Sequence, residues 1–207
     1  MPIEHMLELE IPFKIFYDRC VSDYRIGDTE YYSVAKGSKE KHCYNPYIAT
    51  ERDIQVKLGG IIDDHLFKVG PSFSLNSELG VYRQFSNERA DLSIHRIDNG
   101  MLYVNKNSHL ENLEFVIEIK YANAKTPEFD FVNQSVHKDI RKLSSLGSNI
   151  GKVFVYIDEA DETPEVWRNW LLSECRREEI ILFTNNKHIN SHPEFIYGKH
   201  FFDTVKK

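Results

Sequence analysis

The chain of 207 residues is 41% hydrophobic and 28% charged, which is an ordinary balance for a soluble globular protein with a core of its own. Its formal net charge of -6 gives no overall attraction to nucleic acid, so a phosphate-binding surface must be local or depend on bound cations. The three cysteines, Cys20, Cys43 and Cys175, are widely spaced and argue against a disulfide framework or a cysteine-based zinc site. The sequence has neither an apolar run long enough to span a bilayer nor a signal-peptide pattern at its start, so we expect a cytoplasmic protein.

Residues 1–45 have no periodicity that decides their structure. An apolar run at residues 11–17 is followed by a polar stretch that contains a basic cluster, Lys36, Lys39 and Lys41. Such a cluster is more often a solvated loop than a phosphate contact. We expect residues 1–45 to form an N-terminal extension that packs on the core.

A helix is predicted over residues 50–66. Its apolar residues recur at helical spacing and form one stripe: Ile54, Leu58, Ile61, Ile62 and Leu66. Asn45 or Thr50 is placed to cap the start of this helix. Glu51 lies in the first turn and borders the stripe. It is either an acid favoured by the helix dipole or a residue of a functional site, and both interpretations stay open.

Two strands are predicted next, one over residues 79–85, after a Ser-rich loop, and one over residues 89–97. In the second strand, Asp91, Ser93 and His95 alternate with apolar residues, so the polar side chains share one face. An Asp-Asn-Gly turn signal and a further short apolar run follow this strand.

The strand predicted at residues 113–122 carries two opposite charges within a β-branched and aromatic run. Side chains two residues apart share a face, so Glu118 and Lys120 project together. The apolar residues on the opposite face are Phe115, Ile117, Ile119 and Tyr121. Burying either charge alone is costly, which leaves a solvated face, a structural ion pair, or a site that combines a metal with a cationic group. The polar residues of the preceding strand are expected on the same face as this pair.

The remaining predicted elements are a helix over residues 132–143, a strand over 152–158, a helix that starts at 163–165 and a strand over 179–183. The first of these helices carries a modest basic face. Its candidate residues for contact with a nucleic-acid backbone are Gln134, Lys138, Arg141 and Lys142. Solvation is the commoner role of such a face, and backbone contact is the more specific one.

Other catalytic chemistries lack support in the sequence. The nine histidines show no zinc-ligand spacing, and His95 is expected to be a surface or substrate-proximal residue instead of a ligand. No Gly-rich phosphate loop follows a predicted strand, which argues against an NTPase. Ser-His-Asp catalysis has no Gly-x-Ser-x-Gly motif to support it.

The order of helix, three strands, helix and strand, with an acid opening the second strand and Glu-x-Lys on the third, resembles the PD-(D/E)XK nuclease superfamily. The resemblance covers about residues 45–185 and rests on element order and a degenerate motif. In it, Asp91 matches the metal-binding aspartate, Glu118 the second acid and Lys120 the lysine. Glu51 matches the glutamate that many members carry on the first core helix. The chain departs from the pattern at Ala90, where the family often has proline, and in the length of the segment that separates the two acids.

The resemblance implies a restriction-endonuclease-like α/β fold for residues 46–207, with a mixed central sheet flanked by helices. It also implies a Mg²⁺- or Mn²⁺-dependent endonuclease that hydrolyses phosphodiester bonds, and we expect DNA as the substrate, in restriction, defence or repair. Asp91 and Glu118 would bind the metal, with the Ile119 backbone carbonyl as a third ligand. Lys120 would orient or deprotonate the attacking water and stabilise negative charge.

Two alternatives remain at this point. The chain could be a catalytically inactive protein of the same fold that acts as a nucleic-acid-binding or assembly subunit. Alternatively, Asp91, Glu118 and Lys120 are exposed sheet residues of an unrelated α/β domain. A homodimer or a partner subunit would fit double-strand cleavage, which needs two sites, although the sequence contains no interface signal.

Overall fold

The computed structural model of the chain describes residues 3–22, 32–33, 42–43, 48, 50–69, 73–82, 88–97, 108–122, 130–158 and 164–184. Within these residues the protein is a mixed α/β structure built on a five-stranded sheet of order β3-β4-β5-β6-β7. The sheet strands are β3 (Phe73–Leu79), β4 (Ala90–Arg96), β5 (Leu113–Ala122), β6 (Gly151–Asp158) and β7 (Ile181–Thr184). The principal helices are α1 (Ile3–Phe16), α3 (Glu51–Val69), α5 (Asp130–Ser144) and α6 (Glu165–Arg177). The smaller elements are the π-helical segment η1 (Tyr17–Ser22), the paired strands β1 (Tyr32–Ser33) and β2 (His42–Cys43), and α4 (Ser108–Glu111).

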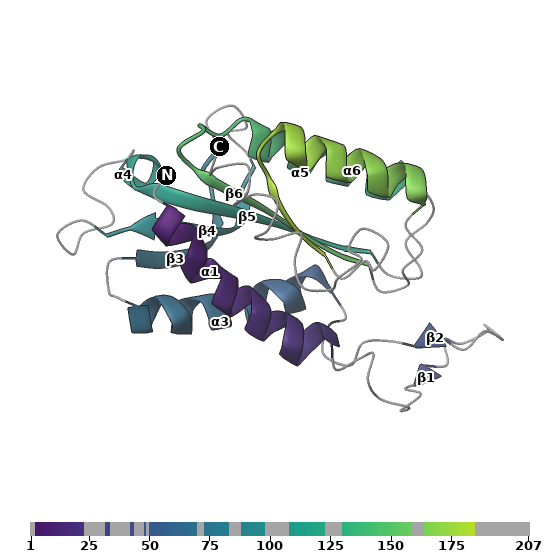
Figure 1. Cartoon of the computed structure of the whole chain (residues 1–207), viewed down its shortest axis with the longest axis horizontal. Helices are drawn as coiled ribbons and strands as arrows, with labels where there is room; N and C mark the ends of the chain where they lie inside the picture. Colours follow the sequence, from purple (N-terminus) through teal and green to yellow (C-terminus); the bar gives the residue numbers. More distant parts are fainter. Residues whose placement is uncertain are drawn as a thin grey trace.

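Helices cover both faces of the sheet, with α1 and α3 on one side and α5 and α6 on the other (Figure 1). β3, β4 and β5 are antiparallel neighbours, whereas β5, β6 and β7 are parallel. Helix α5 connects β5 to β6 and α6 connects β6 to β7, as parallel strands require a crossover. The expected order of helix, three strands, helix and strand is therefore present in α3 through β6.

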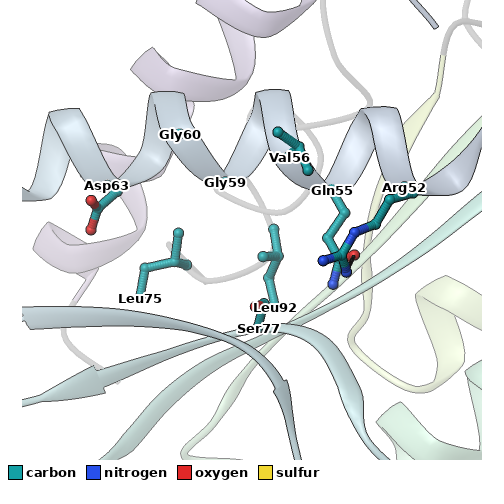
Figure 2. Close-up of a pocket in the computed structure, with 9 residues that line it drawn as sticks. All are labelled: Arg52, Gln55, Val56, Gly59, Gly60, Asp63, Leu75, Ser77 and Leu92. Atoms are coloured by element: carbon teal, nitrogen blue, oxygen red, sulfur yellow. Dashed lines mark hydrogen bonds between the residues drawn. The ribbon is translucent and has the colours of Figure 1, made fainter.

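The N-terminal cap and the apolar stripe that predicted helix α3 are both present in the structure. The Asp53 amide donates a 3.2 Å hydrogen bond to Oγ1 of Thr50, which caps the first turn. The buried residues of its stripe are Ile54, Leu58, Ile62 and Leu66. Figure 2 shows α3 crossing above Leu75 of β3 and Leu92 of β4 at Gly59. A Cβ at Gly59 would lie 3.4 Å from the Leu92 side chain, so a small residue lets the helix approach the sheet closely.

The strand predicted at residues 79–85 is wrong, because the first strand of the sheet lies earlier, at Phe73–Leu79. This strand is at the edge of the sheet and its side chains are only partly buried, so its polar residues are tolerated where the sequence suggested a loop. Val81 and Tyr82 follow it outside regular secondary structure, yet both are buried in the second core. Their apolar character therefore reflects burial and not pairing in a strand. Residues 83–87 lie outside the described part of the chain.

The other predicted elements of the sheet and its helices are confirmed within about three residues at either end. The turn and the short apolar run at residues 98–104 lie outside the described residues, as does the basic cluster near residue 39. At the start of β6, a side chain at Gly151 would overlap the ring of Phe115 on β5, so the two strands require glycine there.

Helix α1 belongs to the first core cluster together with α3 and the facing side of the sheet. Phe13 and Phe16 are completely buried, and the ring centroid of Phe13 lies 5.1 Å from that of Phe183 on β7. The side chains of β5 that were predicted to face away from Glu118 lie in this same cluster. No described helix combines the length and the apolar character needed to cross a membrane.

Candidate functional site

Charged side chains from five elements, α3, β3, β4, β5 and α5, and from the segment before β4 meet in one cleft with a volume of about 330 Å³. The two strands β4 and β5 supply its floor, and the helices α3 and α5 supply charges from either side. The residues that line it are Glu51, Glu78, Glu88, Arg89, Asp91, Glu118, Lys120, Asp139 and Lys142. The cleft thus contains every residue that the sequence proposed for catalysis: Glu51, Asp91, Glu118 and Lys120.

Asp91 is held by the backbone of the neighbouring strand and by α3. Its Oδ2 accepts a 2.6 Å hydrogen bond from the Ile119 amide. Its own backbone carbonyl accepts a 2.6 Å hydrogen bond from Nε2 of Gln55, a buried polar residue of α3. Gln55 and Arg52 project from α3 toward the sheet in Figure 2. Gln55 was not among the residues expected from the sequence, although a polar residue beside the apolar stripe of a helix was a usable signal.

Glu118 is almost fully buried, and both of its carboxylate oxygens have partners. Nζ of Lys142 lies 2.9 Å from Oε2, and the hydroxyl of Tyr82 donates a hydrogen bond to Oε1. Burial and the nearby charge of Asp91 raise the pKa of Glu118 well above its usual range. Burial and the Glu118 carboxylate likewise raise the pKa of Tyr82, so Tyr82 acts as a hydrogen-bond donor.

Lys120 pairs with two carboxylates from different helices and not with Glu118. Its Nζ lies 3.1 Å from Oε1 of Glu51 and 3.4 Å from Oδ2 of Asp139. Burial lowers the pKa of Lys120, but the charges of Asp139 and Glu51 outweigh burial and raise it overall. Lys120 is therefore a protonated ammonium in the metal-free protein.

Asp139 and Lys142 extend this arrangement along α5. Nζ of Lys142 lies 2.9 Å from Oδ1 of Asp139, one helical turn away. Burial lowers the pKa of Lys142, and the carboxylates of Glu118 and Asp139 raise it by more. A continuous chain of hydrogen bonds and ion pairs thus connects Tyr82, Glu118, Lys142, Asp139, Lys120 and Glu51.

The residues of the basic face predicted on α5 lie in different environments. The prediction that Lys142 shares a solvated face with Lys138 and Arg141 is wrong, because its side chain is only 6% exposed and lies in the cleft. Lys138 is exposed and pairs with Glu88 at 2.6 Å. Arg141 is exposed and lines a separate groove between α5 and α6. Gln134 belongs to α5, but its side chain lies outside the described residues.

The prediction that His95 lies at the surface is also wrong. His95 is completely buried, with its Nε2 2.9 Å from Oγ of Ser93. β4 is the second strand of the sheet and is covered on both faces, so Ser93 and His95, which alternate with apolar residues after Asp91, lie in the interior. Of that alternating polar set, Asp91 alone lines the cleft.

Asp91 and Glu118 are the two acids that the sequence proposed as metal ligands. Among the residues that the structure describes, no three acidic, histidine or cysteine side chains are arranged to hold a metal ion together. The two acids nevertheless offer oxygen donors of the kind that Mg²⁺ and Mn²⁺ prefer, and burial raises the pKa of both. A cation beside them would offset the cost of burying their charges. The peptide of Ile119 contacts Asp91 through its amide, and a role for its carbonyl stays a prediction.

We expect Asp91→Asn to stabilise the metal-free protein at alkaline pH and not at acid pH. Burial raises the pKa of Asp91 from 3.8 to about 6, so the folded state holds this proton more tightly than the unfolded state does. The ionised carboxylate therefore costs stability above pH 6, and this cost disappears as the pH falls toward 4. Since one pKa unit corresponds to about 1.4 kcal/mol, the gain at pH 8 should be about 1–3 kcal/mol.

Urea unfolding in EDTA at pH 8, 6 and 4 measures this difference. Asparagine keeps an oxygen that can accept the Ile119 amide, so the substitution removes the charge with little loss of structure. Asp64→Asn, on an exposed face of α3, provides the background value. A gain of the same size at all three pH values would show that the buried charge of Asp91 is not its cause.

Comparison with known proteins adds no relative, because no family model, curated protein or solved structure matches the chain. The structural class of the protein therefore rests on its fold and its charged cleft alone. The protein is a mixed α/β protein with a five-stranded mixed sheet, flanking helices and a charged cleft beside β4 and β5.

Proposed function

We propose that the protein is a Mg²⁺- or Mn²⁺-dependent endonuclease of restriction-endonuclease-like fold that hydrolyses phosphodiester bonds, with DNA as the expected substrate. One observation carries this proposal: Asp91, Glu118 and Lys120, from two neighbouring strands, line the same cleft. The order of α3, β3, β4, β5, α5 and β6 supports it, and so does Glu51 at the start of α3, which reaches Lys120.

The residues have distinct roles in this proposal. Asp91 and Glu118 would hold the divalent cation, which when bound neutralises charge at the phosphate and activates a water molecule. Lys120 would orient that water and stabilise the negative charge that develops on the phosphate oxygens. Because the pKa of Lys120 is raised, its ammonium suits this electrostatic role better than that of a general base. Exposed Lys138 and Arg141 remain candidates for contact with the nucleic-acid backbone, as does Gln134.

A second candidate function is a catalytically inactive protein of the same fold that binds nucleic acid or a partner subunit. The observation that favours it is the pairing of Glu118, whose two oxygens bind Lys142 and Tyr82. In that arrangement the ammonium of Lys142 balances the charge of the Glu118 carboxylate, so Glu118 needs no metal ion as a partner.

Incubation with supercoiled plasmid, single-stranded DNA and RNA separates the two functions when each is combined with Mg²⁺, Mn²⁺ or EDTA. The proposed endonuclease should nick or linearise plasmid with either metal and leave it intact in EDTA. Asp64→Ala, which removes an exposed acid of α3 paired with Lys68 outside the cleft, should cleave like the wild type. Binding of DNA without cleavage of any substrate would instead favour the inactive protein.

A further inference from the structure

Asp139 is a buried acid of α5 that touches two lysines from two different elements. Its Oδ2 lies 3.4 Å from Nζ of Lys120 on β5, and its Oδ1 lies 2.9 Å from Nζ of Lys142 on α5. The Asp139 side chain is only 8% exposed. Its position at the border of the buried stripe of α5, three residues before Lys142, drew no functional prediction from the sequence.

A buried carboxylate partner is needed to hold the ammonium of Lys120 in a fixed position. A lysine side chain is long and flexible, and its charge is a point charge without the fixed geometry of a guanidinium group. Of its two carboxylate partners, Glu51 has a side chain that is 43% exposed, whereas Asp139 is buried. Water and salt screen an exposed ion pair more than a buried one. Asp139 therefore restrains the position of Lys120 more strongly than Glu51 does, although its carboxylate lies slightly farther from Nζ of Lys120.

Asp139 also connects Lys120 to the opposite end of the site. Through Lys142, it joins the ammonium of Lys120 to the carboxylate of Glu118, which lies two residues earlier on the same strand. The two charged side chains of the Glu-x-Lys motif do not form an ion pair with each other, and α5 supplies the pair of residues that bridges them. Movement of α5 would thus displace both groups together.

We propose that Asp139 is a positioning residue that holds the ammonium of Lys120 at the cleft and sets its place relative to Glu118. This inference rests on the proposed function, in which Lys120 acts on the attacking water and the developing charge. Both oxygens of Asp139 are occupied by lysines, so Asp139 acts through Lys120 and contacts no reacting atom. A misplacement of about 1 Å of a reacting or orienting group can lower a rate by about 100-fold, so the effect should be measurable.

The test is a comparison of Asp139→Asn in the wild type with the same substitution in Lys120→Ala. In the wild type, Asp139→Asn should lower kcat for plasmid cleavage by about tenfold while KM and the affinity for Mn²⁺ alone change less than about twofold. In Lys120→Ala the same substitution should lower kcat by less than about twofold, because the group that Asp139 positions is absent. Asp64→Asn removes an acid that pairs with Lys68 one turn further along α3, outside the cleft, and it should leave all these values unchanged.

Asp139→Glu is the second variant and keeps the charge that balances the two buried lysines. It shifts the carboxylate by one methylene group, so kcat should fall by a smaller factor than in Asp139→Asn, again only when Lys120 is present. Equal losses with and without Lys120 in both variants would overturn the positioning role and assign Asp139 to stability alone. Failure of the wild-type protein to cleave, or wild-type rates in Lys120→Ala, would overturn the proposed function itself and this inference with it.

Discussion

Replacement of Asp91 by alanine should abolish both the binding of divalent metal and the cleavage of nucleic acid, while the protein remains folded. Asp91 would provide one of the two carboxylates that hold the cation, and a single carboxylate is a weak site for Mg²⁺, which is strongly hydrated. The loss of a charge that repels Glu118 should offset the loss of the hydrogen bond from the Ile119 amide. The melting temperature in EDTA should therefore stay close to that of the wild type.

Glu118→Ala should abolish metal binding and cleavage as well, but its cost in stability should be larger. The buried ammonium of Lys142 would keep Asp139 as a partner, and the hydroxyl of Tyr82 would lose its acceptor. Loss of a partner by a buried polar group typically costs about 1–3 kcal/mol. Glu118→Gln keeps an acceptor for Tyr82 and is the better variant for measurements of function.

Calorimetric titration with Mn²⁺ and melting curves with and without Mg²⁺ measure these effects directly. A ligand that binds only the folded state raises the melting temperature, so metal should stabilise the wild type and not the variants. Asp63→Ala, which removes an exposed acid of α3 outside the cleft, is the matched control and should respond to metal like the wild type. Equal stabilisation of the Asp91 and Glu118 variants by metal would rule out these two ligands.

Lys120→Ala should lower the rate of cleavage by about 100-fold or more and leave metal affinity and substrate binding within a small factor. This size is typical of removing a group that orients the nucleophile or stabilises charge in the transition state. Lys120 forms its ion pairs with Glu51 and Asp139, so its removal should leave the two proposed metal ligands in place.

Single-turnover cleavage at saturating Mg²⁺ isolates the chemical step from binding and product release. Lys68→Ala provides the control, because Lys68 forms an exposed ion pair with Asp64 at the far end of α3. If Lys120 were only an ion-pair partner of Glu51 and Asp139, its loss would leave hydrolysis untouched, whatever it cost in stability. A wild-type rate in Lys120→Ala would thus remove the catalytic role.

The sequence by itself determined the elements whose side-chain pattern is local. The alternation along β5 separates Glu118 and Lys120 from the apolar face, and the structure confirms that separation because period two is a property of any extended strand. The apolar stripe of α3 likewise predicted the helix, since burial of one face requires helical spacing whatever the partner is. These patterns placed Asp91, Glu118 and Lys120 on one face of the sheet as candidates, whereas the role of Glu51 stayed open until the packing of α3 brought it to Lys120.

The tertiary structure decided which charges meet, because ion pairs between distant residues depend on how helices pack on the sheet. The packing of α5 turns Asp139 and Lys142 into the cleft, although the sequence placed Lys142 on a solvated face. Burial of β4 on both faces put His95 in the interior, and the edge position of β3 allowed a polar strand where a loop was expected. In each case the deciding quantity is which surfaces are covered by other elements, and this is not encoded in the periodicity of any single segment.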